Sequence, residues 1–446
     1  MKTVLVLGAG LVAKPLVRYL LDTPDMQVVV ASRTVSKAET LINGHPQGQA
    51  RSLNVKDAQA LRQAIAGADL AVSLLPYTYH VQVAELCLEF GKDMVTTSYV
   101  SPAMHALDEK AKAAGVTLLN EIGVDPGIDH MSAIKIIHHV QEQGGEITSF
   151  RSWCGGLPAP QDNDNPFGYK FSWSPRGVLL AGRNPAHYVE NGQEIHIPGK
   201  ELFAHHWPVD VPGVPQLEGY PNRDAVPYAD IYGITSARTV FRGTLRYPGW
   251  CDTLKKMVEL GLLDLEEKDW SGLNFQQFTG RLIGFQAQDI RPKVLSQPKG
   301  AVAKALDLPV DSPILDRLEW LGLFSEEPLP LTHGAPLDIL TARMLTKMSY
   351  QKDERDMLVM HHEFVATYPD REAYITSTMI DYGIPGGDTS MSRTVGLPAA
   401  IGTRMILEDK ITQPGVLVPV TPDVYEPVLA ELEQLGISFT EKVRPL

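Results

Sequence analysis

The chain has 446 residues, 40 lysines and arginines, and 53 aspartates and glutamates, for a net charge of −13. This acidic balance argues against proteins that bind nucleic acid or anionic membranes through a general basic face, although a local basic pocket for an acidic small molecule is still compatible with it. At roughly 150 residues per domain, the length suggests about three domains.

The cysteines, histidines and apolar runs exclude several further classes. Cys87, Cys154 and Cys251 are odd in number and far apart, which fits neither a disulfide framework nor a CxxC site. The 13 histidines include three adjacent pairs, at 138–139, 205–206 and 361–362, but form no HExxH pattern, so we expect no metal site. The first apolar run is too short for a signal peptide, and none approaches the roughly 20 residues that span a bilayer. A cytoplasmic protein without a membrane or nucleic-acid partner is therefore expected.

The first 120 residues alternate short apolar runs with amphipathic stretches. The runs are typical of parallel strands covered on both faces, and they lie at 4–7, 28–31, 70–75, 94–97 and 116–119. Helical patterns lie between them at 11–21, 58–66, 80–90 and 102–114. Ser101 and Pro102 predict the N-cap and first residue of the last helix. Repeated β-α units of this kind predict an α/β fold with a Rossmann-like, doubly wound parallel sheet.

The rest of the chain changes character several times. Residues 146–250 are rich in glycine, proline and aromatic residues, which predicts a mixed sheet with binding loops. Residues 251–335 have helical patterns, strands are expected at 357–367 and 373–382, and a helix from about 390 to 408. The last 30 residues predict a strand and a helix that could rejoin the first domain.

These patterns predict three domains. They are a Rossmann-like domain (1–124 and about 391–446), a mixed α/β domain (about 125–250 and 336–390) and a smaller helical domain (about 251–335).

The segment Gly8-Ala9-Gly10-Leu11-Val12-Ala13 fits the dinucleotide-binding pattern G-x-G-x-x-A. Gly8 permits a tight turn, Gly10 lets the backbone approach a pyrophosphate, and the small Ala13 lets the following helix pack on the sheet. The helix N-terminus offers N–H groups and the positive end of a dipole. A tight turn without a ligand is the alternative, but the strand–turn–helix context favours dinucleotide binding.

The end of the second strand bears on the choice of cofactor. An NAD site usually has Asp or Glu about 20 residues after the first glycine, whereas this chain has Ser32-Arg33-Thr34. Two hydroxyls and a guanidinium suit a 2′-phosphate, so the sequence favours NADP over NAD. If Arg33 only stacks on the adenine, NAD remains open.

Ligands of such sheets lie beyond the carboxyl ends of the strands. Leu74-Leu75-Pro76 and Thr97-Ser98-Tyr99 follow two of the predicted strands and are expected to line the nicotinamide half of the site. Ordinary polar loops are the alternative. Besides 8–13, the predicted cofactor contacts are Ser32, Arg33, Thr34, Asn54, Val55, Leu74, Leu75, Thr97, Ser98, Val124, Asp125 and Pro126.

Several longer motifs follow one another along the chain. They are SLLPY (73–77), VTTSY (95–99), NEIGVDPGIDH (120–130), WCGGLPAP (153–160), YKFSWS (169–174), YPNRD (220–224), RGTLRY (242–247) and EWLGLF (319–324). Through these motifs the chain resembles the glutamate-forming saccharopine dehydrogenases, also called saccharopine reductases, over essentially its whole length.

This resemblance implies a reversible oxidoreductase of lysine metabolism, with the physiological direction left open. NADPH would reduce the imine formed between glutamate and 2-aminoadipate 6-semialdehyde, which gives saccharopine, and the reverse reaction would release both compounds. The resemblance also implies that the mixed α/β domain binds substrate and forms a homodimer, and that the helical domain closes the cleft.

The resemblance also assigns substrate contacts. Saccharopine carries three carboxylates, and the matching arginines are Arg223 and Arg246, each able to form paired charge-assisted hydrogen bonds. Thr244 and Leu245 would contribute hydroxyl or backbone donors. A surface ion pair is the usual alternative for a single arginine.

The matching residues nearest the reacting atoms are Ser98, Tyr99, Asp125 and Cys154. Asp125 would orient the secondary amine, and Tyr99 would donate a hydrogen bond to a carboxylate. Cys154 could exchange protons if its pKa were tuned, or could be an inert buried thiol. We take Asp125, Cys154 and Tyr99 as catalytic candidates and His130 as a weaker proton-transfer candidate.

Two other functions stay open at this stage. One is a related amino-acid imine reductase such as carboxynorspermidine dehydrogenase, which would accept a diamine. The other is a catalytically silent NADP-binding protein, although the intact Tyr99, Asp125, Cys154, Arg223 and Arg246 count against it.

Overall fold

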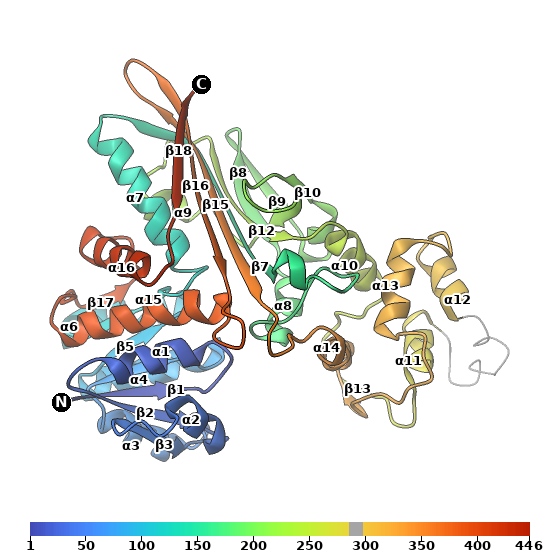
Figure 1. The fold of residues 1–446 in the computed structure, drawn as a ribbon, viewed down its shortest axis with the longest axis horizontal. Helices are drawn as coiled ribbons and strands as arrows, with labels where there is room; N and C mark the ends of the chain where they lie inside the picture. Colours follow the sequence, from blue (N-terminus) through green and yellow to red (C-terminus); the bar gives the residue numbers. More distant parts are fainter. Residues whose placement is uncertain (285–297) are drawn as a thin grey trace. The chain divides into compact units, whose positions relative to one another are not determined.

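The computed structural model describes residues 1–284 and 298–446 (Figure 1). The chain divides into two compact units. Unit 1 comprises Met1–Thr148, Asp230–Ile234 and His362–Leu446, and unit 2 comprises Ser149–Ala229 and Thr235–His361. The division into three domains stays a prediction, and the part of the expected helical domain at 285–297 lies outside the described residues.

Unit 1 contains a seven-stranded sheet whose neighbouring strands all run parallel. In spatial order its strands are β3 (Gly48–Ser52), β2 (Met26–Ser32), β1 (Lys2–Leu7), β4 (Leu70–Ser73), β5 (Asp93–Thr96), β6 (Thr117–Leu119) and β17 (Gly415–Leu417). The order 3-2-1-4-5-6 is that of the Rossmann fold, with the switch point between β1 and β4. The predicted fold class is therefore confirmed.

Helices alternate with the first six strands of this sheet, as the pattern predicted, and unit 1 also contains α7, α15 and α16 from later in the chain (Figure 1). Their bounds are α1 (Ala13–Asp22), α2 (Val35–Ile42), α3 (Ala58–Ala66), η1 (Tyr77–Tyr79), α4 (His80–Phe90), α5 (Pro102–His105), α6 (Asp108–Ala114), α7 (Ile128–Glu142), α15 (Ser390–Leu407) and α16 (Pro422–Gln434).

Ser101 accepts a hydrogen bond from the Met104 N–H, which confirms the predicted N-cap. The prediction of one helix over 102–114 is wrong, because the helix is interrupted at residues 106–107, between α5 and α6.

The C-terminal part of the chain returns to this unit. A Cβ at Gly396 of α15 would lie 3.0 Å from the carbonyl oxygen of Val12 and 3.1 Å from the backbone nitrogen of Leu16, so a glycine lets α15 pack closely on α1. The strand β17 pairs in parallel with β6. This pairing brings residues 415–417 into the parallel sheet, whereas the assignment of about 391–446 to the first domain stays a prediction.

The rest of unit 1 includes the end of β15 (Asp356–Thr367), together with β16 (Glu372–Tyr382) and β18 (Thr440–Pro445). β16 and β18 are antiparallel neighbours. The sequence predicted β15 and β16, and it placed a strand without exact bounds in the last 30 residues, where β18 lies with all six of its residues exposed. Charged residues on an exposed edge strand hide the apolar alternation that identifies a strand.

Unit 2 is built on a mixed sheet. Its strands are β7 (Glu146–Pro158), β8 (Ala186–Glu190), β9 (Gln193–Ile197), β10 (Trp207–Val209), β11 (Leu217–Pro221) and β12 (Thr239–Arg246), with the first part of β15. β12 runs parallel to β7 and antiparallel to β11 and β8. The Trp153 ring fills the space above Gly219 and Gly243, where any Cβ would collide with it.

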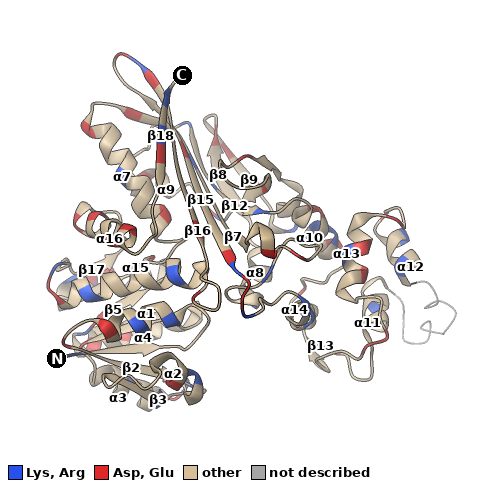
Figure 2. Cartoon of the chain, viewed as in Figure 1, with Lys and Arg blue, Asp and Glu red and all other residues tan. Residues whose placement is uncertain are grey.

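Helices and short strands complete unit 2. They are η2 (Pro160–Asp162), α8 (Pro175–Ala181), η3 (Gly199–Ala204), α10 (Trp250–Glu259), β13 (Lys268–Asp269), α11 (Phe275–Leu282), α12 (Pro298–Ala305), α13 (Pro313–Leu321), β14 (His333–Gly334) and α14 (Pro336–Lys347). The short helix α9 (Tyr228–Ile231) crosses the boundary into unit 1. Acidic and basic residues are interspersed along both units (Figure 2). No described helix is long and apolar enough to cross a membrane.

Candidate active site

The loop after β1 has the shape that its glycines predicted. Gly8 has a φ of +115°, and a Cβ there would lie 2.9 Å from the Leu74 carbonyl oxygen, so only glycine fits. A Cβ at Gly10 would have no described neighbour within 4 Å, which leaves room for a ligand to approach the backbone. Ala13 is fully buried. This is the distribution of roles that the dinucleotide pattern requires.

The ends of β1, β2 and β4 offer further groups at the same edge of the sheet. The helix α1 begins at Ala13 without a side-chain cap from the described residues; the Ala13 N–H donates to the Gly10 carbonyl at 3.2 Å and Pro15 has no N–H, so the Lys14 N–H is the group of the first three helical residues that can serve a phosphate. Arg33 and Thr34 are exposed just after β2, and the Ser32 hydroxyl accepts from the Thr34 N–H at 3.2 Å. These groups fit a dinucleotide with a phosphorylated ribose.

The other predicted cofactor contacts lie in loops that follow strands. Asn54 is exposed after β3, and its Oδ1 accepts from the Lys56 N–H at 3.1 Å. The half-buried Val55 comes next. Leu74 and Leu75 follow β4 and are half-buried, like Thr97 after β5. Their contacts with a cofactor stay a prediction.

A buried histidine that the sequence did not single out connects the ends of β4 and β5. His80 Nδ1 lies 2.8 Å from the hydroxyl of Ser73, and its Nε2 lies 2.8 Å from the hydroxyl of Ser98. Burial lowers the pKa of His80 to about 4, so the ring is neutral near pH 7. His80 therefore orients Ser98, a predicted contact of both cofactor and substrate.

This depressed pKa predicts a stability effect. An unfolded histidine titrates near 6.5, so stability from the neutral His80 is fully present above that pH and is lost as pH falls toward about 4. Between pH 6.5 and pH 5 the loss amounts to about 2 kcal/mol. The wild type should therefore lose stability between pH 7 and pH 5, and His80→Gln should lose about 2 kcal/mol less over the same range because glutamine does not titrate. Urea denaturation of both proteins at the two pH values measures the free energies of unfolding. The exposed His105→Gln is the control, and an unchanged pH dependence in His80→Gln would refute this assignment.

Tyr99 and Asp125, two predicted catalytic residues, contact each other. The Tyr99 hydroxyl donates to Asp125 Oδ1 at 2.9 Å, and both side chains are half-buried. The Asp125–Pro126 peptide bond is cis. Gly127 has a φ of +147°, and a Cβ there would collide with Gly123, so the turn before α7 requires glycine. Val124 and Pro126 are buried in this turn.

A second buried group secures the segment that carries Ser98 and Tyr99. Glu121 accepts from the Val100 N–H at 2.8 Å, and its own N–H donates to the Ser98 carbonyl at 3.1 Å. The other carboxylate oxygen of Glu121 lies 2.7 Å from His130 Nε2, and His130 Nδ1 lies 2.7 Å from the Tyr232 hydroxyl. His130, the weaker proton-transfer candidate, is fully buried and contacts Glu121. The structure thus gives it a positioning role beneath the segment that carries Ser98 and Tyr99.

In unit 2, three predicted residues share one face of the mixed sheet. Thr244 of β12 pairs with Cys154 of β7, and Arg246 lies two residues further along β12. Because side chains alternate along a strand, all three project to the same side, whereas the fully buried Leu245 projects to the other. Leu245 can therefore serve this face only through its backbone.

Arg246 is a buried cation without a carboxylate partner among the described residues. It is 6% exposed, and its guanidinium carbon lies 5.0 Å from the Tyr169 ring centroid and 5.6 Å from that of Trp250. One amino group donates to the Leu245 carbonyl at 2.7 Å. Its Nε is buried and has no hydrogen-bond partner in the part of the chain that the structure describes. Such an arginine fits an anionic ligand.

The nearest acidic residue in the sheet is engaged elsewhere. Glu218 of β11 pairs with Arg246 in the strand register. Its carboxylate accepts from the N–H groups of Gly249 at 3.0 Å and Cys251 at 2.7 Å, where it caps the start of α10. This capping role leaves the cation of Arg246 to a ligand.

The two remaining predicted residues, Arg223 and Cys154, differ from Arg246 in their surroundings. Arg223 is exposed in the segment after β11, with a φ of +56°, and its carbonyl accepts from the His187 N–H at 2.8 Å. Cys154 is 8% exposed. Cys87, Cys154 and Cys251 are all buried, and none of them is in a disulfide bond.

Two family models match the chain. Residues 4–119 match the saccharopine dehydrogenase NADP binding domain, and residues 123–437 match the saccharopine dehydrogenase C-terminal domain. The first match supports the choice of NADP as cofactor, whereas the individual contacts of Ser32, Arg33 and Thr34 stay predictions.

Known proteins are similar along the whole chain. The saccharopine dehydrogenase [NADP(+), L-glutamate-forming] of Schizosaccharomyces pombe is 43% identical, over 99% of both chains. The mitochondrial alpha-aminoadipic semialdehyde synthase of Bos taurus is 39% identical over 98% of this chain but only 47% of its own length. A solved structure of saccharopine dehydrogenase (L-Glu forming) from Saccharomyces cerevisiae matches with a TM-score of 0.88 and 39% identity, and covers all of both chains.

Proposed function

The chain belongs to the saccharopine dehydrogenase family, and on that premise we propose that it is an NADP(H)-dependent oxidoreductase that interconverts saccharopine with L-glutamate and 2-aminoadipate 6-semialdehyde. The observation in the structure that carries this proposal is Arg246, a buried guanidinium with an unpaired Nε among the described residues. A fixed, desolvated cation suits a substrate with three carboxylates.

The proposed function assigns several groups to the cofactor and to the reacting amine. The loop 8–13 and the N-terminus of α1 bind the pyrophosphate, and Arg33 binds the 2′-phosphate. NADP(H), when bound, supplies or accepts the hydride. Asp125 accepts a hydrogen bond from the secondary amine and stabilises positive charge that develops on it, while Tyr99 holds the Asp125 carboxylate in place.

The carboxylates of the substrate are assigned to a second set of residues. Arg246 offers its Nε and its free amino group to one carboxylate, and the Thr244 hydroxyl on the same face adds a donor. Arg223 binds a second carboxylate from its exposed segment. Cys154 lines the same face as Thr244. Proton transfer is left to the amines of the substrate, with Asp125 as the orienting group.

A direct assay tests this function. The purified protein should reduce NADP in the presence of saccharopine, followed by the absorbance of the reduced nicotinamide, with NAD in a parallel reaction. Activity only with a diamine in place of glutamate would favour a carboxynorspermidine dehydrogenase. Binding of NADP without turnover of any of these substrates would favour a silent NADP-binding protein.

The cofactor assignment has its own test. Replacing Arg33 with alanine removes the bidentate donor for the 2′-phosphate but nothing that NADH needs. Because hydrogen bonds to charged groups contribute about 1.5–3 kcal/mol, we expect the preference for NADPH over NADH to fall by about 10-fold or more. The ratio of kcat/KM for the two cofactors measures it. An unchanged ratio would mean that Arg33 only stacks on the adenine.

The proposal extends to the state of the protein in the cell. We propose a cytoplasmic homodimer with small-molecule partners and no nucleic-acid partner, the last of which the net charge of −13 supports. Light scattering of the purified protein measures the oligomeric state, and a monomeric mass would contradict the homodimer.

A further inference from the structure

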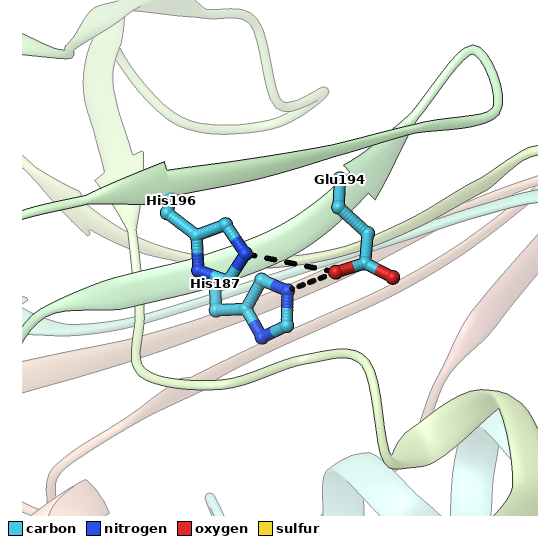
Figure 3. A group of neighbouring side chains, drawn as sticks. All are labelled: His187, Glu194 and His196. Carbon is cyan, nitrogen blue, oxygen red and sulfur yellow. Dashed lines mark hydrogen bonds and ion pairs between the residues drawn. The ribbon is translucent and has the colours of Figure 1, made fainter.

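Three side chains of one hairpin in unit 2 face one another outside the candidate active site (Figure 3). His187 lies on β8, and Glu194 and His196 lie on β9. The strands are antiparallel, with His187 opposite His196 and Val189 opposite Glu194. Side chains two residues apart on a strand share a face, so the hairpin brings both imidazoles and the carboxylate to one side.

The spacing of these groups is that of metal ligands. Glu194 Oε2 lies 3.0 Å from His187 Nε2 and 3.6 Å from His196 Nε2. One ligand atom from each residue falls within 4.8 Å of the other two. In a tetrahedral zinc site with bonds of about 2.0–2.1 Å, neighbouring ligand atoms stand about 3.3 Å apart.

A second carboxylate supports this interpretation independently. His187 Nδ1 lies 3.1 Å from Asp224 Oδ1. Metal-binding histidines almost always donate their other ring N–H to such a group, which fixes the tautomer and the ring orientation. Asp224 and Glu194 thus flank the His187 ring, with Nδ1 facing Asp224 and Nε2 facing Glu194, which is the arrangement that a metal ion on Nε2 requires.

We propose that His187, Glu194 and His196 bind one divalent transition-metal ion of the zinc type, with Asp224 orienting His187. The two imidazole planes are 15° apart with centroids separated by 3.8 Å, so binding requires a rotation of each ring about χ2 that makes the lone pairs converge. The side chains of Glu194 and His196 are 61% and 68% exposed, which allows this rotation and leaves a fourth position for water.

The ion would stabilise a segment next to the predicted substrate residue Arg223. Besides the bond to the Arg223 carbonyl, the His187 carbonyl accepts from the Ala225 N–H at 2.7 Å. An ion on His187 therefore ties the hairpin to residues 223–225 through both backbone bonds and Asp224. Metal binding itself does not depend on the proposed reaction, so the two can fail separately.

Calorimetric titration of the untagged, chelator-treated full chain with ZnCl2 tests the site. We expect one Zn²⁺ per chain, loss of this binding in His196→Ala, and affinity reduced about 10–100-fold in Asp224→Asn. The exposed His205→Ala is a matched control and should bind like the wild type. A rise in the thermal midpoint with Zn²⁺, seen in the wild type but not in His196→Ala, gives a second readout.

Two results would overturn the proposal. One is the absence of saturable Zn²⁺ binding by the wild type. The other is binding that survives in both His196→Ala and Glu194→Gln. If such binding were lost in Cys251→Ser instead, the ion would belong to the other group of neighbouring ligand atoms, formed by His206, Glu218 and Cys251.

Discussion

Replacing Arg246 with alanine should lower kcat/KM for saccharopine by about 30-fold to several thousand-fold. Removing one partner of a buried, hydrogen-bonded charge pair costs about 2–5 kcal/mol, and each 1.36 kcal/mol is a factor of about ten in rate. The loss should be this large because Arg246 is 6% exposed, so water cannot replace its hydrogen bonds to a carboxylate. Steady-state kinetics with saccharopine as the varied substrate measure it.

The dissociation constant for NADPH should stay close to the wild-type value in Arg246→Ala, since Arg246 is not among the predicted cofactor contacts. Arg246→Lys keeps the positive charge but loses the planar pair of N–H donors, so its kcat/KM should lie between those of the wild type and Arg246→Ala. Arg238→Ala, at an exposed position of the same unit, is the control. If Arg246→Ala folded and oxidised saccharopine with normal kinetics, the assignment of a carboxylate to Arg246 would be wrong.

The dinucleotide-binding half was predictable because its signals are local. Buried parallel strands appear in the sequence as apolar runs. In the loop after β1, Gly8 adopts a positive φ and lies so close to the Leu74 carbonyl that no other residue fits there. The strand β3, which joins the sheet at its edge, was missed. Its sequence, Gly48–Ser52, has a single apolar residue and no fully buried one, so no apolar run identifies it.

The candidate site was predictable only where its residues lie in contiguous motifs. Tyr99, Asp125, Thr244 and Arg246 were found through such motifs. His80 was missed because the two hydroxyls that it joins follow different strands of the sheet. Tyr232 was missed because it contacts His130 from 102 positions away. Such contacts form because the fold brings distant segments together, so no spacing of residues within a short stretch of sequence predicts them.

The histidines show the same limit in another way. Adjacent pairs such as His205-His206 are visible in the sequence but are poor chelates, because neighbouring side chains point in different directions. His187 and His196 are nine positions apart, and only the turn between β8 and β9 makes them cross-strand neighbours. The expectation of no metal site was based on the HExxH pattern and on adjacent histidines, and neither pattern detects ligands that lie opposite each other on two strands of a hairpin.

His130→Ala should lower the free energy of unfolding by about 2–5 kcal/mol, because truncating a buried side chain leaves a cavity and a buried acceptor without its hydrogen-bond partner. His130 is fully buried and lies 2.7 Å from Glu121 Oε2, so its loss leaves that carboxylate oxygen without the imidazole. The same change removes the partner of the Tyr232 hydroxyl and leaves a cavity. Urea denaturation of both proteins at pH 7 measures the difference.

Two further variants separate the contributions within this group. Tyr232→Phe removes one hydrogen bond and should cost about 1 kcal/mol. His130→Gln retains an N–H donor for Glu121 and should recover part of the stability lost in His130→Ala. Because Glu121 also holds the Val100 N–H and the Ser98 carbonyl, His130→Ala should lower kcat for saccharopine as well, whereas Tyr232→Phe should not. Equal stability of His130→Ala and wild type would show that the Glu121 carboxylate does not need this partner.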